Sequence, residues 1–389
     1  SGSLAGVVGH LLGGYLADTP AYGRKRTLLF AAILAIGAAV ILTVNHTFPL
    51  LVIANVLLGL SAGCYWTASD ATVVDATITE QRQLAFALLV LMDSLGGGAG
   101  VWAGDRLMRL LEQTQYLFGL SILPLLLFTS LIALLMDDPE PVDKPTEPLA
   151  GFGIALRDRW LLQFVLVNVL FTTYIALVGN VLPLYLTTIV PESWSVASLF
   201  TWCYIIVGAV IQLPLVQLLK PMPKVRALML SMGLWAIGFG LIWLIDWGNS
   251  GSGSGTGALL RVIAALIVLS IASTVYKPFA PAIVAELAPA SLRGVYLAIS
   301  YQCWSIGYFI APILGGWAMD QSAPIARQGW LVTAATTLLG LVLLQWLSQR
   351  PISLASHLES DESADSPVTT HVMNANGTHP AASDAAKLL

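Results

Sequence analysis

The chain alternates between long apolar stretches and short polar connections along nearly all of its 389 residues. A helix needs about 20 apolar residues to cross the hydrocarbon core of a bilayer. Ten stretches approach or exceed that length, and they run over 27–44, 48–69, 84–104, 116–136, 160–189, 193–219, 226–246, 258–286, 294–318 and 329–347. An eleventh, 3–17, is shorter. The pattern predicts an all-α polytopic membrane protein with about eleven helices.

Composition agrees with this prediction. Hydrophobic residues make up 57% of the chain and charged residues 10%, with a mean hydropathy of +0.79. Soluble domains carry about 25% charged residues. The net charge of −4 gives no basic surface for a nucleic acid. Cys64, Cys203 and Cys303 all lie in apolar stretches without metal-binding spacing, so we expect buried thiols.

The distribution of cations predicts an orientation. If the stretches cross in alternation, thirteen of the 18 Lys and Arg residues fall on one side, four fall on the other, and Lys277 lies within a stretch. The positive-inside rule places the richer side, and with it the C-terminus, in the cytoplasm. Ser1 would then lie outside. Because the chain begins with Ser inside an apolar stretch, we expect a twelve-helix parent whose first helix is missing here.

Polar segments divide the chain. Residues 137–159 form a charged, Pro-rich stretch that follows the would-be sixth helix. We therefore expect an N-terminal half-bundle over 1–136 (helices 2–6), a cytoplasmic linker over 137–159 and a C-terminal half-bundle over 160–349 (helices 7–12). Residues 350–389 are rich in Ser, Ala, Asp and Thr, which predicts a disordered cytoplasmic tail.

A basic loop follows the first stretch. Its residues of interest are Gly14, Asp18, Gly23, Arg24 and Lys25. They resemble the loop signature between helices 2 and 3 of the major facilitator superfamily, roughly G-x-x-x-D-R-x-G-R-R. This chain departs from it at Thr19, where Arg is usual, and in two extra residues before Gly23. The loop alone is also compatible with an ordinary positive-inside connection.

An internal repeat strengthens the resemblance. Residues 71–108 align without gaps on 282–319, so that Arg82 matches Arg293 and Asp75 faces Glu286. Parallel repeats of six helices are the architecture of the major facilitator fold. The resemblance implies that Asp75 joins Asp18 and Arg24 in a conformational switch. The full predicted set for this switch is Gly14, Asp18, Gly23, Arg24, Lys25, Asp75, Arg82, Glu286 and Arg293.

Glycines recur at helical spacing in two stretches. Gly96, Gly100 and Gly104 are four residues apart, and the repeat carries Gly307, Pro312, Gly315 and Gly316. Such spacing predicts close helix packing. The superfamily's proton antiporters have a similar motif, but Val101 replaces its Pro and Asp105 its last Gly. Asn55 stands where those antiporters usually carry an Arg.

Charged residues inside apolar stretches are the strongest functional signals. Each costs about 2.5–3.5 kcal/mol at a helix centre, so such residues tend to face an interior or a wet cavity. We expect Asp93, near mid-depth, to bind a proton or contact substrate; it could instead stay ionised in a wet cavity. Asp70 and Lys277 are expected at similar depth in opposite halves. They could form an ion pair between the halves or reach water independently.

Aromatic and amide residues lie in the same stretches and could line a cavity for bulky apolar or cationic solutes. Packing against helices or lipid is the alternative for each. The set comprises Tyr65, Trp66, Tyr174, Trp202, Tyr204, Tyr301, Gln302, Trp304 and Tyr308.

The segment from Ala71 to Arg109 resembles the MdtH-related bacterial multidrug-efflux branch of the superfamily. That resemblance implies a monomeric secondary transporter of the plasma (bacterial inner) membrane that exports hydrophobic or cationic compounds in exchange for protons. An uptake carrier for a small polar solute and a non-transporting sensor of the same fold are the alternatives. We expect no cofactor or metal. Because His-Glu-x-x-His, Gly-x-Ser-x-Gly and Walker-type sequences are absent, we also expect neither an enzyme nor an ATP-driven pump.

Overall fold

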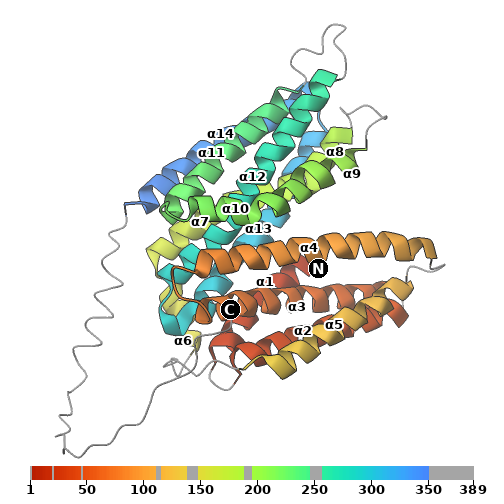
Figure 1. Cartoon of the computed structure of the whole chain (residues 1–389), viewed down its shortest axis with the longest axis vertical. Helices are drawn as coiled ribbons and strands as arrows, with labels where there is room; N and C mark the ends of the chain where they lie inside the picture. The colour runs from red at the N-terminus through yellow and green to blue at the C-terminus, as the bar shows by residue number, and fades with distance from the viewer. Residues whose placement is uncertain are drawn as a thin grey trace, which may run out of the picture. The chain divides into compact units, whose positions relative to one another are not determined.

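The computed structural model describes residues 2–19, 22–44, 47–110, 115–137, 148–187, 195–245 and 256–349. Within these ranges every regular element is helical, as the apolar pattern predicted (Figure 1). Ten described helices are long and apolar enough to cross a membrane. The eleventh expected helix, α1, is present but has 17 residues and is not among the ten.

The helices follow the predicted stretches closely. The N-terminal helices are α1 (Gly2–Asp18), α2 (Gly23–Val44), α3 (Phe48–Asp75), α4 (Arg82–Leu110) and α5 (Gln115–Leu135). A short α6 (Pro148–Ala155) lies within the expected linker. The remaining helices are α7 (Arg159–Ala176), α8 (Leu182–Thr187), α9 (Val196–Phe200), α10 (Val207–Leu219), α11 (Lys224–Trp243), α12 (Thr256–Leu287), α13 (Arg293–Met319) and α14 (Ala323–Leu347).

Three shorter helical turns complete this set. Two π-helical segments, η1 (Leu177–Val181) and η2 (Thr201–Ile206), join α7 to α8 and α9 to α10. The 3₁₀ turn η3 (Ala290–Leu292) precedes α13. Residues 138–147 of the expected linker and the expected tail, 350–389, lie outside the described residues.

Local chemistry sets several helix boundaries. Gly23 has a φ of 74° at the start of α2, a conformation that costs glycine little because it lacks a Cβ. The Asp158 side chain accepts hydrogen bonds from the backbone N–H groups of Trp160 and Leu161 and so caps α7. These features end one helix and begin the next within a few residues.

Helices α1, α2, α3 and α5 contact mainly one another along the N-terminal part of the chain, and α7–α14 contact mainly one another, whereas α4 makes most of its contacts with α10 and α12. We call α1–α5 the N-terminal and α7–α14 the C-terminal helix group; Figure 1 shows them as neighbouring bundles. The two groups meet where α1 contacts α13 and where α4 contacts α10 and α12. Most of the largest buried side chains, including Trp235, Phe239 and Tyr174, lie in the C-terminal group.

Small residues allow the closest contacts of α1. A Cβ added to Gly13 would lie 2.7 Å from the Cα of Cys64 in α3. One added to Gly14 would lie 2.6 Å from the Cβ of Ala298 in α13. α1 therefore packs closely against both helix groups.

The glycine spacings have different outcomes in the two repeats. Cβ atoms added to Gly307 and Gly315 would lie 2.5 and 2.2 Å from Thr172 and Val181, so both glycines permit close packing. Gly316 is open, with no atom within 4 Å of an added Cβ, and Pro312 is exposed.

The packing expected at Gly96, Gly100 and Gly104 is not found among the described residues. No described atom lies within 4 Å of an added Cβ at any of the three glycines. The three glycines leave one face of α4 without side chains, but no described helix lies against this face.

Candidate functional site

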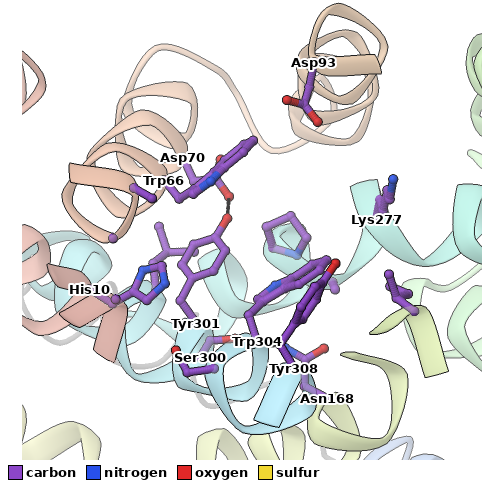
Figure 2. A pocket seen from close by; sticks show the side chains of 18 of the residues that line it. His10, Trp66, Asp70, Asp93, Asn168, Lys277, Ser300, Tyr301, Trp304 and Tyr308 are labelled. Atoms are coloured by element: carbon purple, nitrogen blue, oxygen red, sulfur yellow. Dashed lines mark hydrogen bonds between the residues drawn. The ribbon is translucent and has the colours of Figure 1, made fainter. Parts of the chain in front are cut away.

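A cavity of about 560 Å³ lies where the helix groups meet (Figure 2). Helices α1, α3 and α4 line it from the N-terminal group, and α7, α12 and α13 line it from the C-terminal group. Its polar or aromatic lining residues are His10, Trp66, Asp70, Phe86, Asp93, Asn168, Tyr276, Lys277, Ser300, Tyr301, Trp304, Ser305 and Tyr308.

Asp70 lies on the cavity wall and is only 2% exposed. Its Oδ2 accepts a hydrogen bond from the hydroxyl of Tyr301, which Figure 2 draws as a dashed line. Its Oδ1 is buried and has no hydrogen-bond partner among the described residues. One oxygen of this carboxylate is thus bound to α13, while the other has no partner.

The ring of His10 packs against the ring of Tyr301. The two rings stack with their centroids 5.1 Å apart and their planes 7° from parallel. The His10 Nδ1 lies 3.3 Å from the Thr67 hydroxyl. His10 is not among the site residues predicted from the sequence. A lone His in the apolar stretch 3–17 is nevertheless costly unless it faces a polar partner, which is a signal of a site.

Asp93 and Lys277 face the cavity from α4 and α12. Asp93 is exposed, and Lys277 is partly buried beside Pro278. The ion pair between Asp70 and Lys277, one of the two alternatives that the sequence left open, is not formed: neither residue makes an ion pair in the described parts of the chain. The depth expected from the sequence did not predict the partner of Asp70, because its carboxylate points toward Tyr301 and accepts a hydrogen bond from the Tyr301 hydroxyl.

The predicted aromatic set divides into two classes. Four members line the cavity: Trp66, Tyr301, Trp304 and Tyr308. The ring centroids of Trp304 and Tyr308 lie 6.0 Å apart.

The other members of that set lie away from the cavity. Tyr174 is buried against Trp235 and hydrogen-bonds the Thr336 hydroxyl at 2.8 Å. Tyr65 packs edge-on against Phe128. Trp202 is 65% exposed.

Two further members connect helices through their polar atoms. The Gln302 side chain donates to the carbonyl of Val7 in α1 at 3.3 Å. The backbone carbonyl of Tyr204 accepts from the Ser270 hydroxyl. Neither residue lines the cavity.

A buried polar group that the sequence did not indicate lies on the C-terminal side of the cavity. The Tyr276 hydroxyl donates to Asn168 Oδ1, and Asn168 Nδ2 donates to the Ser300 hydroxyl at 3.3 Å. These bonds connect α12, α7 and α13. They satisfy the polar atoms of this wall within the C-terminal group.

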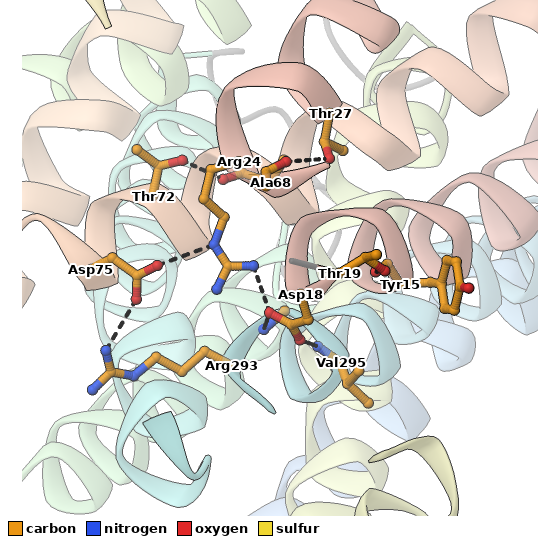
Figure 3. Close-up of polar contacts among 12 residues, drawn as sticks. Tyr15, Asp18, Thr19, Arg24, Thr27, Ala68, Thr72, Asp75, Arg293 and Val295 are labelled. Carbon is orange, nitrogen blue, oxygen red and sulfur yellow. Dashed lines mark hydrogen bonds and ion pairs between the residues drawn. The ribbon is translucent and has the colours of Figure 1, made fainter. Parts of the chain in front are cut away.

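A helix-end cluster of Asp18, Arg24, Asp75 and Arg293 joins the ends of α1, α2, α3 and α13 (Figure 3). Arg24 Nη1 lies 2.5 Å from Asp18 Oδ1, and Arg24 Nε lies 3.1 Å from Asp75 Oδ2. Arg293 pairs with the other Asp75 oxygen at 3.1 Å. Asp18 also accepts from the backbone N–H groups that begin α13, at Gly294 and Val295.

The other charged residues of the predicted switch set are Lys25, Glu286 and Arg82. Lys25 follows Arg24 in the first turn of α2. Glu286, the counterpart of Asp75 in the repeat, forms an ion pair with Lys224. Arg82, the counterpart of Arg293, is buried at the start of α4, and its Nε has no hydrogen-bond partner among the described residues. The two halves of the repeat are therefore not paired alike.

Comparisons with known proteins agree with this arrangement. A Na⁺, Li⁺, K⁺/H⁺ antiporter from Planococcus maritimus is 24% identical over 346 residues, which cover 79% of this chain and 77% of the antiporter. The multidrug resistance protein MdtH of Cronobacter sakazakii is 26% identical over 314 residues, covering 80% and 73%. The crystal structure of the human organic anion transporter MFSD10 matches with a TM-score of 0.71 at 20% identity, covering 88% and 82%.

The family profile of the Major Facilitator Superfamily matches residues 1–260 and 177–382. These matches extend over both helix groups and the cavity between them. The chain therefore belongs to the Major Facilitator Superfamily, a family of multi-pass membrane transporters.

Proposed function

We propose that the protein is a secondary active transporter that exports hydrophobic or cationic compounds in exchange for protons. The observation that carries this proposal is the cavity between the helix groups, because α1, α3, α4, α7, α12 and α13 all contribute to its wall. A site shared by two bundles can open to either side when one bundle rocks against the other.

The two helix groups would be the moving parts. We assign residues 1–136 and 160–349 to two half-bundles joined by the linker 137–159. The helix-end cluster connects them, since Arg293 and the first turn of α13 bind Asp75 and Asp18 of the N-terminal group. Opening at this end would require those bonds to break.

The composition of the cavity wall supports a cationic, partly apolar solute. Two carboxylates, Asp70 and Asp93, face it, and Lys277 supplies one positive charge. With His10 neutral, one negative charge lacks a counter-charge. The faces of Trp66 and Trp304 add surfaces suited to a cation or an apolar ring. The name of the relative MdtH, a multidrug resistance protein, is in keeping with this substrate class.

A second candidate is exchange of an inorganic cation for protons. The same carboxylates could bind a monovalent metal ion, and one relative is named as a Na⁺, Li⁺, K⁺/H⁺ antiporter. The aromatic lining favours an organic solute. Uptake of a small polar solute is the remaining transport alternative.

Localisation and orientation follow from the same proposal. We place the protein in the plasma (bacterial inner) membrane as a monomer with a cytoplasmic C-terminus, which the asymmetry of Lys and Arg supports. A C-terminal fusion to a reporter that is active only in the cytoplasm tests this orientation. No activity from this reporter, together with activity from a C-terminal reporter that works only in the periplasm, would contradict it.

Efflux of a fluorescent cationic dye from cells producing the protein tests the proposal. We expect energy-dependent efflux that a protonophore abolishes and that Asp93→Asn reduces. Asp320→Asn is the matched control, because it makes the same chemical change at the exposed end of α13. Absence of dye efflux would favour assays of inorganic cation exchange and then of solute uptake. Efflux unchanged in Asp93→Asn would leave export standing and remove Asp93 from it.

A further inference from the structure

The hydrogen bond between Tyr301 and Asp70 connects the two helix groups at the cavity. Asp70 belongs to α3, and Tyr301 belongs to α13, 231 residues further along the chain. A hydrogen bond to an ionised carboxylate is roughly twice as strong as one between neutral groups. The charge on Asp70 therefore determines how firmly α3 holds α13 at this level.

The free oxygen of Asp70 indicates a missing ligand. Asp70 is nearly fully buried, lines the cavity and has an Oδ1 without a hydrogen-bond partner in the described structure. Buried carboxylate oxygens are normally paired, because an unpaired one loses its hydration without compensation. A proton or a cationic group reaching Oδ1 through the cavity would supply this partner.

Other titratable groups line the same space from four helices. They are His10 on α1, Asp93 on α4, Tyr276 and Lys277 on α12, and Tyr301 and Tyr308 on α13. On α3 itself, Tyr65 and Asp75 lie outside the cavity lining, and Asp75 is held by two Arg residues. None of the described cations forms an ion pair with Asp70. Its charge is thus not fixed by a salt-bridge partner.

We infer that Asp70 carries the exchanged proton and that Tyr301 is its positioning residue. The inference deepens the proposed function and rests on it, since it names the residue that bears the proton. Water in the cavity delivers a proton to Oδ1, where an O–H bond forms and the negative charge disappears. The Tyr301 bond then becomes a weaker neutral one, so α13 separates from α3 more easily. Release of the proton to water on the opposite side restores the stronger bond.

His10 acts on this pair through its ring. Stacking on Tyr301 and the contact with Thr67 hold the phenol in line with Asp70. The imidazole has no direct hydrogen bond to Asp70. We therefore assign His10 to orientation of Tyr301 rather than to proton carriage.

Infrared difference spectroscopy on the purified full chain in lipid nanodiscs tests the proton site directly. Spectra taken during an acid-to-alkaline titration should contain a protonated-carboxyl component that Asp70→Asn removes and Asp93→Asn leaves. Tyr301→Phe keeps the ring that stacks on His10, and it should move the pH at which this component titrates. A spectrum of Asp70→Asn that superimposes on wild type would overturn the inference, as would loss of the component in Asp93→Asn.

Transport in proteoliposomes separates this inference from the proposed function. In Asp70→Asn, the rate of dye transport driven by a pH gradient should fall at least about tenfold. This is the scale of one hydrogen bond to a charged group. The variant should retain exchange of labelled against unlabelled dye, which needs no proton. Wild-type protein that moves no dye would contradict the proposed function, while the infrared result would still decide the proton site. Gradient-driven transport that persists in Asp70→Asn would overturn the inference alone.

The role of His10 has its own variants. His10→Phe preserves an aromatic face and should keep the wild-type pH profile of transport, whereas His10→Ala should shift that profile as Tyr301→Phe does. A profile altered equally by His10→Phe and His10→Ala would show that the imidazole itself takes part in proton transfer and would overturn its assignment as an orienting group.

Discussion

The helix-end cluster and the cavity each contain a buried carboxylate, but the two carboxylates differ in how many of their oxygens have partners. In the helix-end cluster, Asp18 is 1% exposed, yet it binds Arg24 and two backbone N–H groups. In the cavity, Asp70 is equally buried but has one oxygen without a partner, and Lys277 forms no ion pair among the described residues.

From this difference we expect the charges of the helix-end cluster to hold the structure and those of the cavity to bind ligands. A buried charge whose hydrogen-bond and ion-pair partners all belong to the protein should keep its protonation state during transport unless the helices separate. A buried charge with an open oxygen can gain a partner from solution. Substitutions in the first region should therefore affect stability, and substitutions in the second should affect coupling.

The largest effect on stability is expected for Arg24→Ala. This change leaves Asp18 buried with its charge uncompensated, and breaking a buried pair in this way costs about 3–5 kcal/mol. The unfolding temperature in detergent should fall strongly. Arg26→Ala is the control: Arg26 is exposed, and an exposed charge contributes only about 0–1 kcal/mol. Equal destabilisation by the two changes would contradict the assigned role of the cluster.

A smaller loss is expected for Gly14→Ala. The added Cβ would lie 2.8 Å from the carbonyl oxygen of Gly294, so α1 and α13 would have to move apart. Overpacking of this kind costs about 1–3 kcal/mol. The unfolding temperature of the variant measures the cost. An unchanged value would show that the contact between α1 and α13 is looser than described.

Arg293→Ala should destabilise less again. Arg293 and Asp75 are each about one-fifth exposed, and Asp75 keeps its bond to Arg24 in the variant. The loss should be about 1 kcal/mol or less. Because Arg293 crosses between the helix groups, the change should also increase thiol labelling of a cysteine introduced beside the helix-end cluster, which has no cysteine of its own. Unchanged labelling would show that Arg293 does not help to close this end.

The smallest effect is expected for Gly96→Ala. The glycine has open space around it, and replacing Gly by Ala inside a helix is favourable by roughly 0.5–1 kcal/mol. The unfolding temperature should stay level or rise slightly. A fall comparable to that of Gly14→Ala would show that this face of α4 packs against another helix.

The sequence predicted the fold well, because membrane spans depend on length and apolar composition, which are local properties. The contact of Asp18 with Arg24 was also predictable, since a loop of a few residues holds both near the same helix ends. The interpretation of the glycines at 96, 100 and 104 failed because spacing describes one helix face and not its neighbour.

The cavity was harder to predict. Asp70 and Tyr301 are brought together only by the approach of α3 and α13, and nothing local to either helix specifies that contact. The sequence repeat predicts a similar depth for Asp70 and Lys277, but the direction of each side chain depends on helix rotation. The sequence therefore indicated which residues are costly in a membrane, while the structure was needed to show which of them meet.

The most direct test is to follow protons and solute together in inverted membrane vesicles. A pH gradient is established and monitored with a fluorescent pH probe, and a cationic dye is then added. Vesicles with wild-type protein should lose part of the gradient on dye addition, and vesicles with Asp70→Asn should not. A gradient unaffected by the dye in wild-type vesicles, or reduced equally with Asp70→Asn, would contradict proton exchange through Asp70.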